Sequence, residues 1–391
     1  MRKMNENATI IVPVQFNSDC TWSKFRKSIF CELRNNQKDI CRNDKIEILQ
    51  WKMLKYFVSS EKKTSRKWNS ELYVTDNAAF EKKVENIKQE QDFLYREAFR
   101  TLYDEEYAAS CMFMLTVGKD ENVTLLEDLC LGINFGGEVR KIRKAYILLT
   151  NVKSCLIVLE LCEIEKSADG SNKVNRLEHI TDILSKYKQE SLTAGLVKWV
   201  FGDDLKQREY VLPFGENVYS AVLKQNKSEN VSREIPKVQI DSFSMTWERD
   251  YEEKAIGTFF GQYFQLYLLC ILQKTEMLRL SQKAGDASRK IIVPIMSRLI
   301  NKISGEYAVF SNQFDFVECS YDKQGTQIYN KLQEEMQIDK ARDCVREQIK
   351  VLREYATFVS SRLTNILLAV ISFIASVVTI VGFCQSICGG N

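Results

Sequence analysis

The chain contains 391 residues and carries a formal net charge of +3; 45% of its residues are hydrophobic and 27% are charged. A chain of this length and composition can bury a proper core, which excludes a largely disordered protein, and its near-neutral charge gives no reason to expect a nucleic acid partner. The twelve cysteines are scattered without a Cys-x-x-Cys motif, which is typical of reduced core thiols in the cytoplasm.

Apolar runs predict strands and helices in the first part of the chain. Residues Thr9–Phe16 predict a strand, Thr21–Leu33 a helix, Ala78–Asp104 a longer helix and Met112–Val117 another strand. These elements indicate a mixed α/β body.

A β-hairpin is predicted in the middle of this body. The apolar runs Ala145–Thr150 and Cys155–Cys162 are joined by only four residues, which is hairpin spacing. Further on, Leu177–Tyr187 predicts an amphipathic helix and Val218–Leu223 a short helix.

A glycine-containing segment before the hairpin is a candidate anion-binding site. We expect Gly132–Gly137 to form a loop that is followed by basic side chains. Glycines allow a close approach of the backbone and the basic side chains supply charge, as the phosphate of a small nucleotide ligand requires. The alternative is a solvated strand edge that is protected from pairing by its charges. The candidate ligand-binding residues are Gly136, Gly137, Arg140, Lys141, Arg143 and Lys144.

The sequence contains no motif that argues for catalysis. His179 is the single histidine, so there is no second histidine for a metal pair or a catalytic triad. The Gly-x-Ser-x-Gly, phosphate-binding-loop and His-Glu-x-x-His patterns are also absent. We therefore expect no enzyme, no catalytic residues, no metal site and no resident cofactor. An enzyme assembled from distant cysteines or carboxylates and tethered to a membrane stays open as a third interpretation.

Helices dominate the sequence after Arg249. The apolar stretch Phe259–Leu280 is interrupted by glutamines and followed by charges, which favours a buried helix over a membrane span. Ser288–Ile303 predicts a helix that Pro294 either starts or kinks.

The segments that follow lead toward the C-terminus. Phe310–Glu318 predicts a short extended segment, and Gln327–Met336 predicts a helix that runs into the next element.

Residues 339–362 predict a polar stalk helix with one apolar seam. The apolar positions alternate in steps of four and three among charged neighbours, which is a heptad pattern. This seam packs either on a partner copy of the chain or on the protein's own body. The oligomer-seam residues are Val345, Ile349, Leu352, Ala356, Val359 and Leu363.

Residues 363–384 predict a transmembrane helix that continues the stalk. No charged residue occurs between Leu363 and Asn391, and 22 residues at about 1.5 Å each can cross a bilayer. Arginines and lysines precede this segment and none follows it, so the positive-inside rule predicts a single-pass protein of the cell membrane with a cytoplasmic N-terminal domain.

The predicted span also carries a polar stripe. Its members lie within about 40° of one line on a helix. Such a stripe either lines a wet lumen in an oligomer or bonds its own helix carbonyls and allows close helix packing. The candidate pore-lining residues are Asn365, Ser372, Ser376 and Thr379.

These features resemble the CorA-like family of divalent-cation transporters and its bacterial relatives. The resemblance is carried by Tyr263–Lys274, Thr326–Leu332 and Gln348–Arg362 leading into Leu363–Leu367; it covers 249–384, and 155–162 more weakly. It implies a cytoplasmic α/β domain, a stalk helix and a homo-oligomer that is a pentamer in the family. It also implies a divalent cation or, as in relatives that act in antiviral defence, a nucleotide as ligand.

The sequence departs from the family at the end of the span. The family's Gly-Met-Asn signature and second span are expected after the first span, whereas Gly389-Gly390-Asn391 stand here. The Mg²⁺ selectivity that the signature carries is therefore not transferred.

Together these observations predict an α+β protein with long C-terminal helices. The expected parts are a cytoplasmic α/β domain (1–248), a helical region (249–338), the stalk (339–362), the span (363–384) and a short tail (385–391). We expect a homo-oligomeric, ion-conducting or membrane-permeabilising pore whose partners are the lipid bilayer and further copies of itself. The alternative is a tail-anchored scaffold or binding module without a pore.

Overall fold

The structure is a computed structural model of the whole chain. It describes residues 7–16, 20–35, 38–42, 45–54, 110–117, 132–135, 138–162, 192–202, 210–214, 218–225, 237–238, 242–247, 259–289 and 293–388. The predicted helices Ala78–Asp104 and Leu177–Tyr187, the latter with His179, lie outside these residues.

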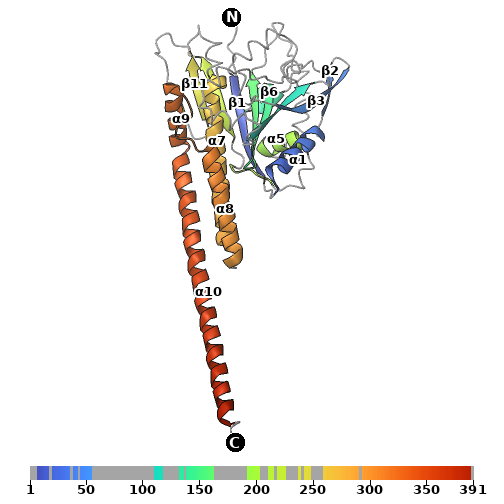
Figure 1. The fold of residues 1–391 in the computed structure, drawn as a ribbon. Coiled ribbons are helices and arrows are strands. Elements are labelled where there is room, and N and C mark those ends of the chain that lie inside the picture. Colours follow the sequence, from blue (N-terminus) through green and yellow to red (C-terminus); the bar gives the residue numbers. More distant parts are fainter. Residues whose placement is uncertain are drawn as a thin grey trace, which may run out of the picture. The chain divides into compact units, whose positions relative to one another are not determined.

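A mixed β-sheet forms the centre of the N-terminal part (Figure 1). Its strand order is β10-β11-β9-β1-β7-β6-β4-β3-β2, while β5 pairs with β6 and β8 with β1. The β9–β11 pair is parallel, whereas the other described pairs are antiparallel. The strands are β1 (Asn7–Phe16), β2 (Lys38–Arg42), β3 (Lys45–Leu54), β4 (Ser110–Val117), β5 (Gly132–Phe135), β6 (Glu138–Thr150), β7 (Ser154–Cys162), β8 (Tyr210–Val211), β9 (Tyr219–Gln225), β10 (Lys237–Val238) and β11 (Ser242–Trp247).

Helices α1 (Trp22–Asn35) and α5 (Leu192–Phe201) cover one face of the sheet. Side chains such as Phe25 of α1 and Leu196 of α5 join the same buried cluster as Ile10 and Val12 of β1. The opposite face carries α7 (Phe264–Ser288), whose Tyr267 ring lies 5.5 Å from the Phe243 ring of β11. Because β1 is buried on both faces, its sequence reads as a nearly continuous apolar run.

The predicted hairpin is confirmed as β6 and β7. Its turn places Lys153 at φ 67°, a left-handed conformation, and the Lys153 amide donates to the Thr150 carbonyl at 2.9 Å. The Thr150 hydroxyl donates to the Ser154 carbonyl at 3.0 Å and accepts from the Ser154 amide at 3.2 Å. The strands predicted at Thr9–Phe16 and Met112–Val117 and the helix at Thr21–Leu33 are confirmed as β1, β4 and α1.

Three local predictions are wrong. Gly132–Phe135 is strand β5 rather than a loop, because it pairs with β6. Val218–Leu223 is largely strand β9, because it lies between β1 and β11 and alternates buried Tyr219 and Ala221 with less buried neighbours. The predicted extended segment Phe310–Glu318 begins as helix, because the rings of Phe310 and Phe314 stack one helical turn apart at 5.6 Å.

The C-terminal part is helical. A π-helical turn at Phe259–Tyr263 precedes α7. Helix α8 (Val293–Phe314) carries Pro294 in its first turn, where proline is tolerated, so Pro294 starts the helix. Helix α9 (Lys323–Glu335) is capped by Asp322, whose carboxylate accepts from the Gly325 amide at 2.9 Å. Helix α10 (Ile338–Cys388) then runs for 51 residues without a break.

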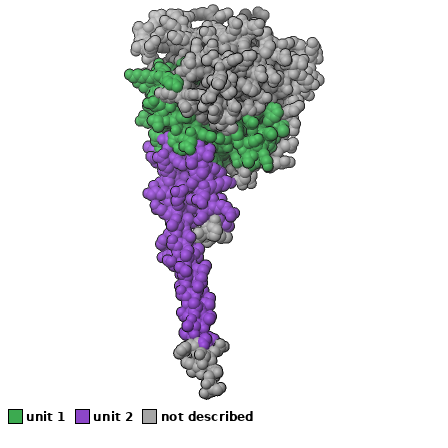
Figure 2. All heavy atoms as spheres, in the orientation of Figure 1, with its two compact units in different colours: residues 1–279, 310–339 green, residues 280–309, 340–391 purple. Residues whose placement is uncertain are grey.

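The chain divides into two compact units (Figure 2). The first comprises residues 1–279 and 310–339, and the second comprises residues 280–309 and 340–391. Within the second unit, Met296 and Ile300 of α8 pack against Leu352 and Ala356 of α10. The sheet, helices α1 and α5, and residues 264–279 of α7 belong to the first unit.

Candidate functional site

Helix α10 contains the segment with which the chain can meet a membrane. Among the described residues, one helix is long and apolar enough to cross a bilayer, and its most apolar stretch is not buried within the protein. The residues from Leu363 to Gly382 measure about 30 Å along a helix, which matches the hydrocarbon core of a bilayer. Residues 339–362 and 363–384 belong to one continuous helix, so the predicted continuity of these two segments is confirmed.

The polar stripe of the span is exposed along its whole length. Asn365, Ser372, Ser376 and Thr379 all lie on the surface of the single chain. The Ser376 hydroxyl donates to the Ser372 carbonyl and the Thr379 hydroxyl to the Ala375 carbonyl, each at 2.8 Å. These two hydroxyls therefore have partners inside the helix and still present oxygen lone pairs to whatever lies outside it.

The apolar seam of the stalk is divided between buried and exposed positions. Val345, Ile349 and Ala356 are buried, whereas Leu363 is 50% exposed. Leu352 and Ala356 pack on α8 of the same chain. Next to them, the Arg353 guanidinium donates to the Ser304 hydroxyl at 3.1 Å. The intersubunit role of the seam stays a prediction, and part of this face is used within the chain.

A second candidate region lies on one turn of α7, where successive polar side chains bond to different elements. The Gln273 amide donates to the Phe314 carbonyl at 2.6 Å and to the Tyr329 hydroxyl at 2.9 Å. The Lys274 ammonium donates to the Met336 carbonyl at 2.6 Å. One helical turn therefore joins the end of α8, the middle of α9 and the residues just before α10.

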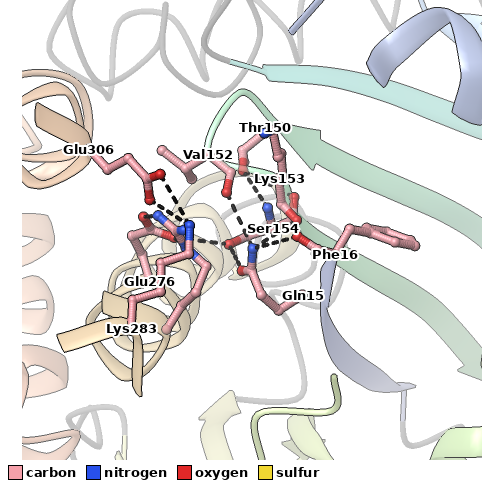
Figure 3. Close-up of polar contacts among 10 residues, drawn as sticks. Gln15, Phe16, Thr150, Val152, Lys153, Ser154, Glu276, Lys283 and Glu306 are labelled. Atoms are coloured by element: carbon pink, nitrogen blue, oxygen red, sulfur yellow. Dashed lines mark hydrogen bonds and ion pairs between the residues drawn. The ribbon is translucent and has the colours of Figure 1, made fainter. Parts of the chain in front are cut away.

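The same turn also reaches the sheet (Figure 3). The Ser154 hydroxyl on β7 donates to Gln15 Oε1 at 2.6 Å and lies 3.5 Å from Glu276 Oε2. The Gln15 amide of β1 donates to the Val152 and Lys153 carbonyls at 3.3 and 3.1 Å, which fixes the hairpin turn. Glu276 is thereby placed against the β6–β7 turn.

Arg279 neutralises Glu276 within α7. The carboxylate is fully buried and accepts from Arg279 Nε at 2.8 Å, with a second close contact from Nη2. A buried carboxylate is stable only when it is paired and hydrogen-bonded, so Arg279 is what allows Glu276 to face the sheet. We refer to Gln273, Lys274, Glu276 and Arg279 as the α7 polar turn.

Burial changes the titration of groups beside the α7 polar turn. Burial lowers the pKa of Lys274, although its bond to the Met336 carbonyl favours the ammonium form. Burial also raises the pKa of Cys319 to about 12, and it raises the pKa values of Cys270 and Tyr329. The thiols of Cys270 and Cys319 are therefore protonated at neutral pH and are poor nucleophiles or metal ligands.

The basic residues of the predicted anion site are on a strand rather than in a loop. Arg140, Lys141, Arg143 and Lys144 belong to β6, and the β6–β7 register shifts between Ile142 and Lys144. Gly136 and Gly137 lie outside the described residues. Ligand binding by this segment stays a prediction.

No cluster of three or more histidine, cysteine, aspartate or glutamate side chains suited to a metal ion occurs in the part of the chain that the structure describes. The α7 polar turn was not predicted as a site. Its signal was nevertheless present, because glutamine, lysine, glutamate and arginine interrupt a helix that is otherwise apolar and buried.

No family model matches the chain, and no curated protein or solved structure matches it significantly. The geometry of α10 and of the α7 polar turn is therefore the basis for a functional assignment.

Proposed function

We propose that the chain is a single-span membrane protein of the cell membrane whose copies assemble through α10 into an ion-conducting pore. The sheet-bearing domain lies in the cytoplasm in this proposal. The observation that carries it is the continuity of α10, which joins a charged stalk to an uncharged segment of bilayer length with an exposed polar stripe.

The polar stripe supports assembly of several copies. A lone span would turn Asn365 and three hydroxyl side chains toward lipid, where an amide side chain is costly to accommodate. A ring of parallel helices places the stripe in a wet lumen or between neighbouring helices. One span cannot enclose a lumen alone, so the pore requires a homo-oligomer, in line with the pentamer that the family resemblance implies.

The α7 polar turn supports control of the pore by the cytoplasmic domain. It bonds the β6–β7 turn through Glu276, and it bonds the residue that precedes the α9–α10 junction through Lys274. A ligand that binds the sheet and shifts the hairpin would act on the start of α10 through this turn. The basic residues of β6 are the candidate contacts for such a ligand, a small nucleotide.

The pore is tested by Ser376→Leu in proteoliposomes. Replacing a hydroxyl in the stripe by a branched apolar side chain should dry the lumen and lower ion flux. Ile374→Leu is the control, because Ile374 lies off the stripe and the exchange conserves volume. Equal flux from wild type, Ser376→Leu and empty liposomes, with the oligomer intact in detergent, would remove the pore.

A tail-anchored scaffold is the second candidate. The hydroxyls of Ser376 and Thr379 already bond to carbonyls of their own helix, so neither depends on water in a lumen. The mass of the protein in mild detergent separates the candidates, because a ring requires several copies whereas a scaffold functions as a monomer or dimer.

A further inference from the structure

Arg362 is the single charged side chain in the last 37 residues of the sequence, from Tyr355 to Asn391. It directly precedes the uncharged span, and it is exposed in the chain. The nearest carboxylate before it on α10 is Glu354, eight residues away, which is about 12 Å along a helix. Exposed charges at that separation are largely screened at physiological ionic strength, so the field at the start of the span is positive.

Arg362 lies at the edge of the polar stripe of α10. On an ideal helix its Cα lies about 40° and 60° from Ser376 and Asn365, and about 80° and 100° from Ser372 and Thr379. The face that packs on α8 through Leu352 and Ala356 is about 80–120° away. The backbone of Arg362 therefore lies between the two faces, nearer the stripe, and the direction of its guanidinium decides which face it serves.

An aromatic ring beside Arg362 holds the guanidinium on the side of the stripe. The Arg362 Cζ atom lies 4.6 Å from the centroid of the Phe358 ring. Phe358 is itself 54% exposed and lies seven residues before Asn365, so it extends the line of the stripe toward the start of α10. The guanidinium thus faces the region that the stripe faces, at its cytoplasmic end.

We propose that Arg362 forms a ring of positive charge at the cytoplasmic mouth of the pore and makes the pore select small inorganic anions. This inference rests on the proposed function, whose polar stripe carries no fixed charge of its own. Rings of arginine or lysine favour anions because they raise the local anion concentration and repel cations. No carboxylate follows Glu354 on α10, so no negative side chain of this helix offsets the charge of Arg362.

The test measures the reversal potential of purified protein in planar bilayers across a KCl gradient. Wild type should show a chloride-over-potassium permeability ratio above one. Arg362→Lys should keep that ratio above one, Arg362→Gln should bring it to about one, and Arg362→Glu should invert it. Arg353→Glu is the control, because Arg353 lies about 180° around the helix and should leave the ratio unchanged.

The outcomes separate this inference from the proposed function. A conducting wild type that prefers potassium, or a ratio that Arg362→Glu leaves unchanged, would overturn the anion selectivity and assign Arg362 to lipid headgroups, while the pore stands. The absence of current from wild type, with intact oligomers in the bilayer, would overturn the pore itself. Detergent-phase mass measured for each variant verifies that the compared proteins are assembled.

Discussion

The buried ion pair of Glu276 and Arg279 shows how a charged side chain comes to face a β-sheet. Glu276 is fully buried and Arg279 is 6% exposed. Two buried charges are compatible with a stable fold only when they form an ion pair with each other. Loss of one partner leaves the other charge buried and unpaired. The pair is thus a sensitive point in the first unit of the chain.

Glu276→Gln should lower the free energy of unfolding by about 3–5 kcal/mol, because Arg279 then keeps a buried charge without its counterion. Thermal unfolding of the detergent-solubilised protein measures the change. Glu306→Gln is the matched control, since it breaks an ion pair with Lys283 whose side chains are 25% and 34% exposed, worth about 0–1 kcal/mol. If both variants unfolded at the same temperature, the buried pair would not have the role assigned to it.

At the scale of elements, α10 uses its two sides differently. One side packs on α8 through Leu352 and Ala356, while the other leaves Val351, Tyr355 and Phe358 more than 50% exposed. Exposed aromatic side chains in a charged helix are unusual for a surface that meets only water. This part of α10 therefore has one face that the chain covers itself and one face that is exposed in the single chain.

Leu352→Asp tests which role the seam has. If the seam joins subunits, the oligomer should dissociate while the soluble body stays folded, because each chain would bury a carboxylate without a partner. Analytical ultracentrifugation in detergent measures the mass, and circular dichroism verifies the fold. An unchanged mass together with a lowered melting temperature would assign Leu352 to the contact with α8 alone.

Sequence periodicity predicted the elements whose partners are close along the chain. The β6–β7 hairpin has two apolar runs joined by a short turn, and this local pattern was sufficient to predict it. The apolar segment of α10 is too long for a strand, so its length was sufficient to predict a helix. Strand β9 was missed because its pairing with β1 and β11 depends on residues far away in the sequence. Propensity alone cannot supply that tertiary information.

The candidate sites divide in the same way. The stripe from Asn365 to Thr379 could be read from its spacing, because a single helix fixes its geometry. The contacts of the α7 polar turn could not be predicted from spacing, because Ser154, Met336 and Tyr329 meet α7 only when the sheet and the later helices are assembled. The interruptions in the apolar helix showed that polar partners exist, without identifying them.

At the scale of the whole molecule, the distribution of charge sets the expected orientation in the membrane. Five basic residues between Arg342 and Arg362 precede the proposed span, and no lysine or arginine stands between Leu363 and Asn391. Cytoplasmic retention of such a cluster is the rule for membrane proteins. A protease should therefore digest the sheet domain in inverted vesicles, as followed by immunoblot, and leave it intact in right-side-out vesicles. Digestion in right-side-out vesicles would establish the opposite orientation.

The position of β1 in the sheet has a consequence for biosynthesis. This strand precedes its partners β7 and β9, whose matching residues lie about 150 and 210 positions later in the chain. During translation, the apolar side chains of Ile10, Ile11 and Val12 have no β7 or β9 to cover them, and an uncovered strand of this kind is prone to aggregate. The central part of the sheet can therefore form only after the residues of β9 have been synthesised.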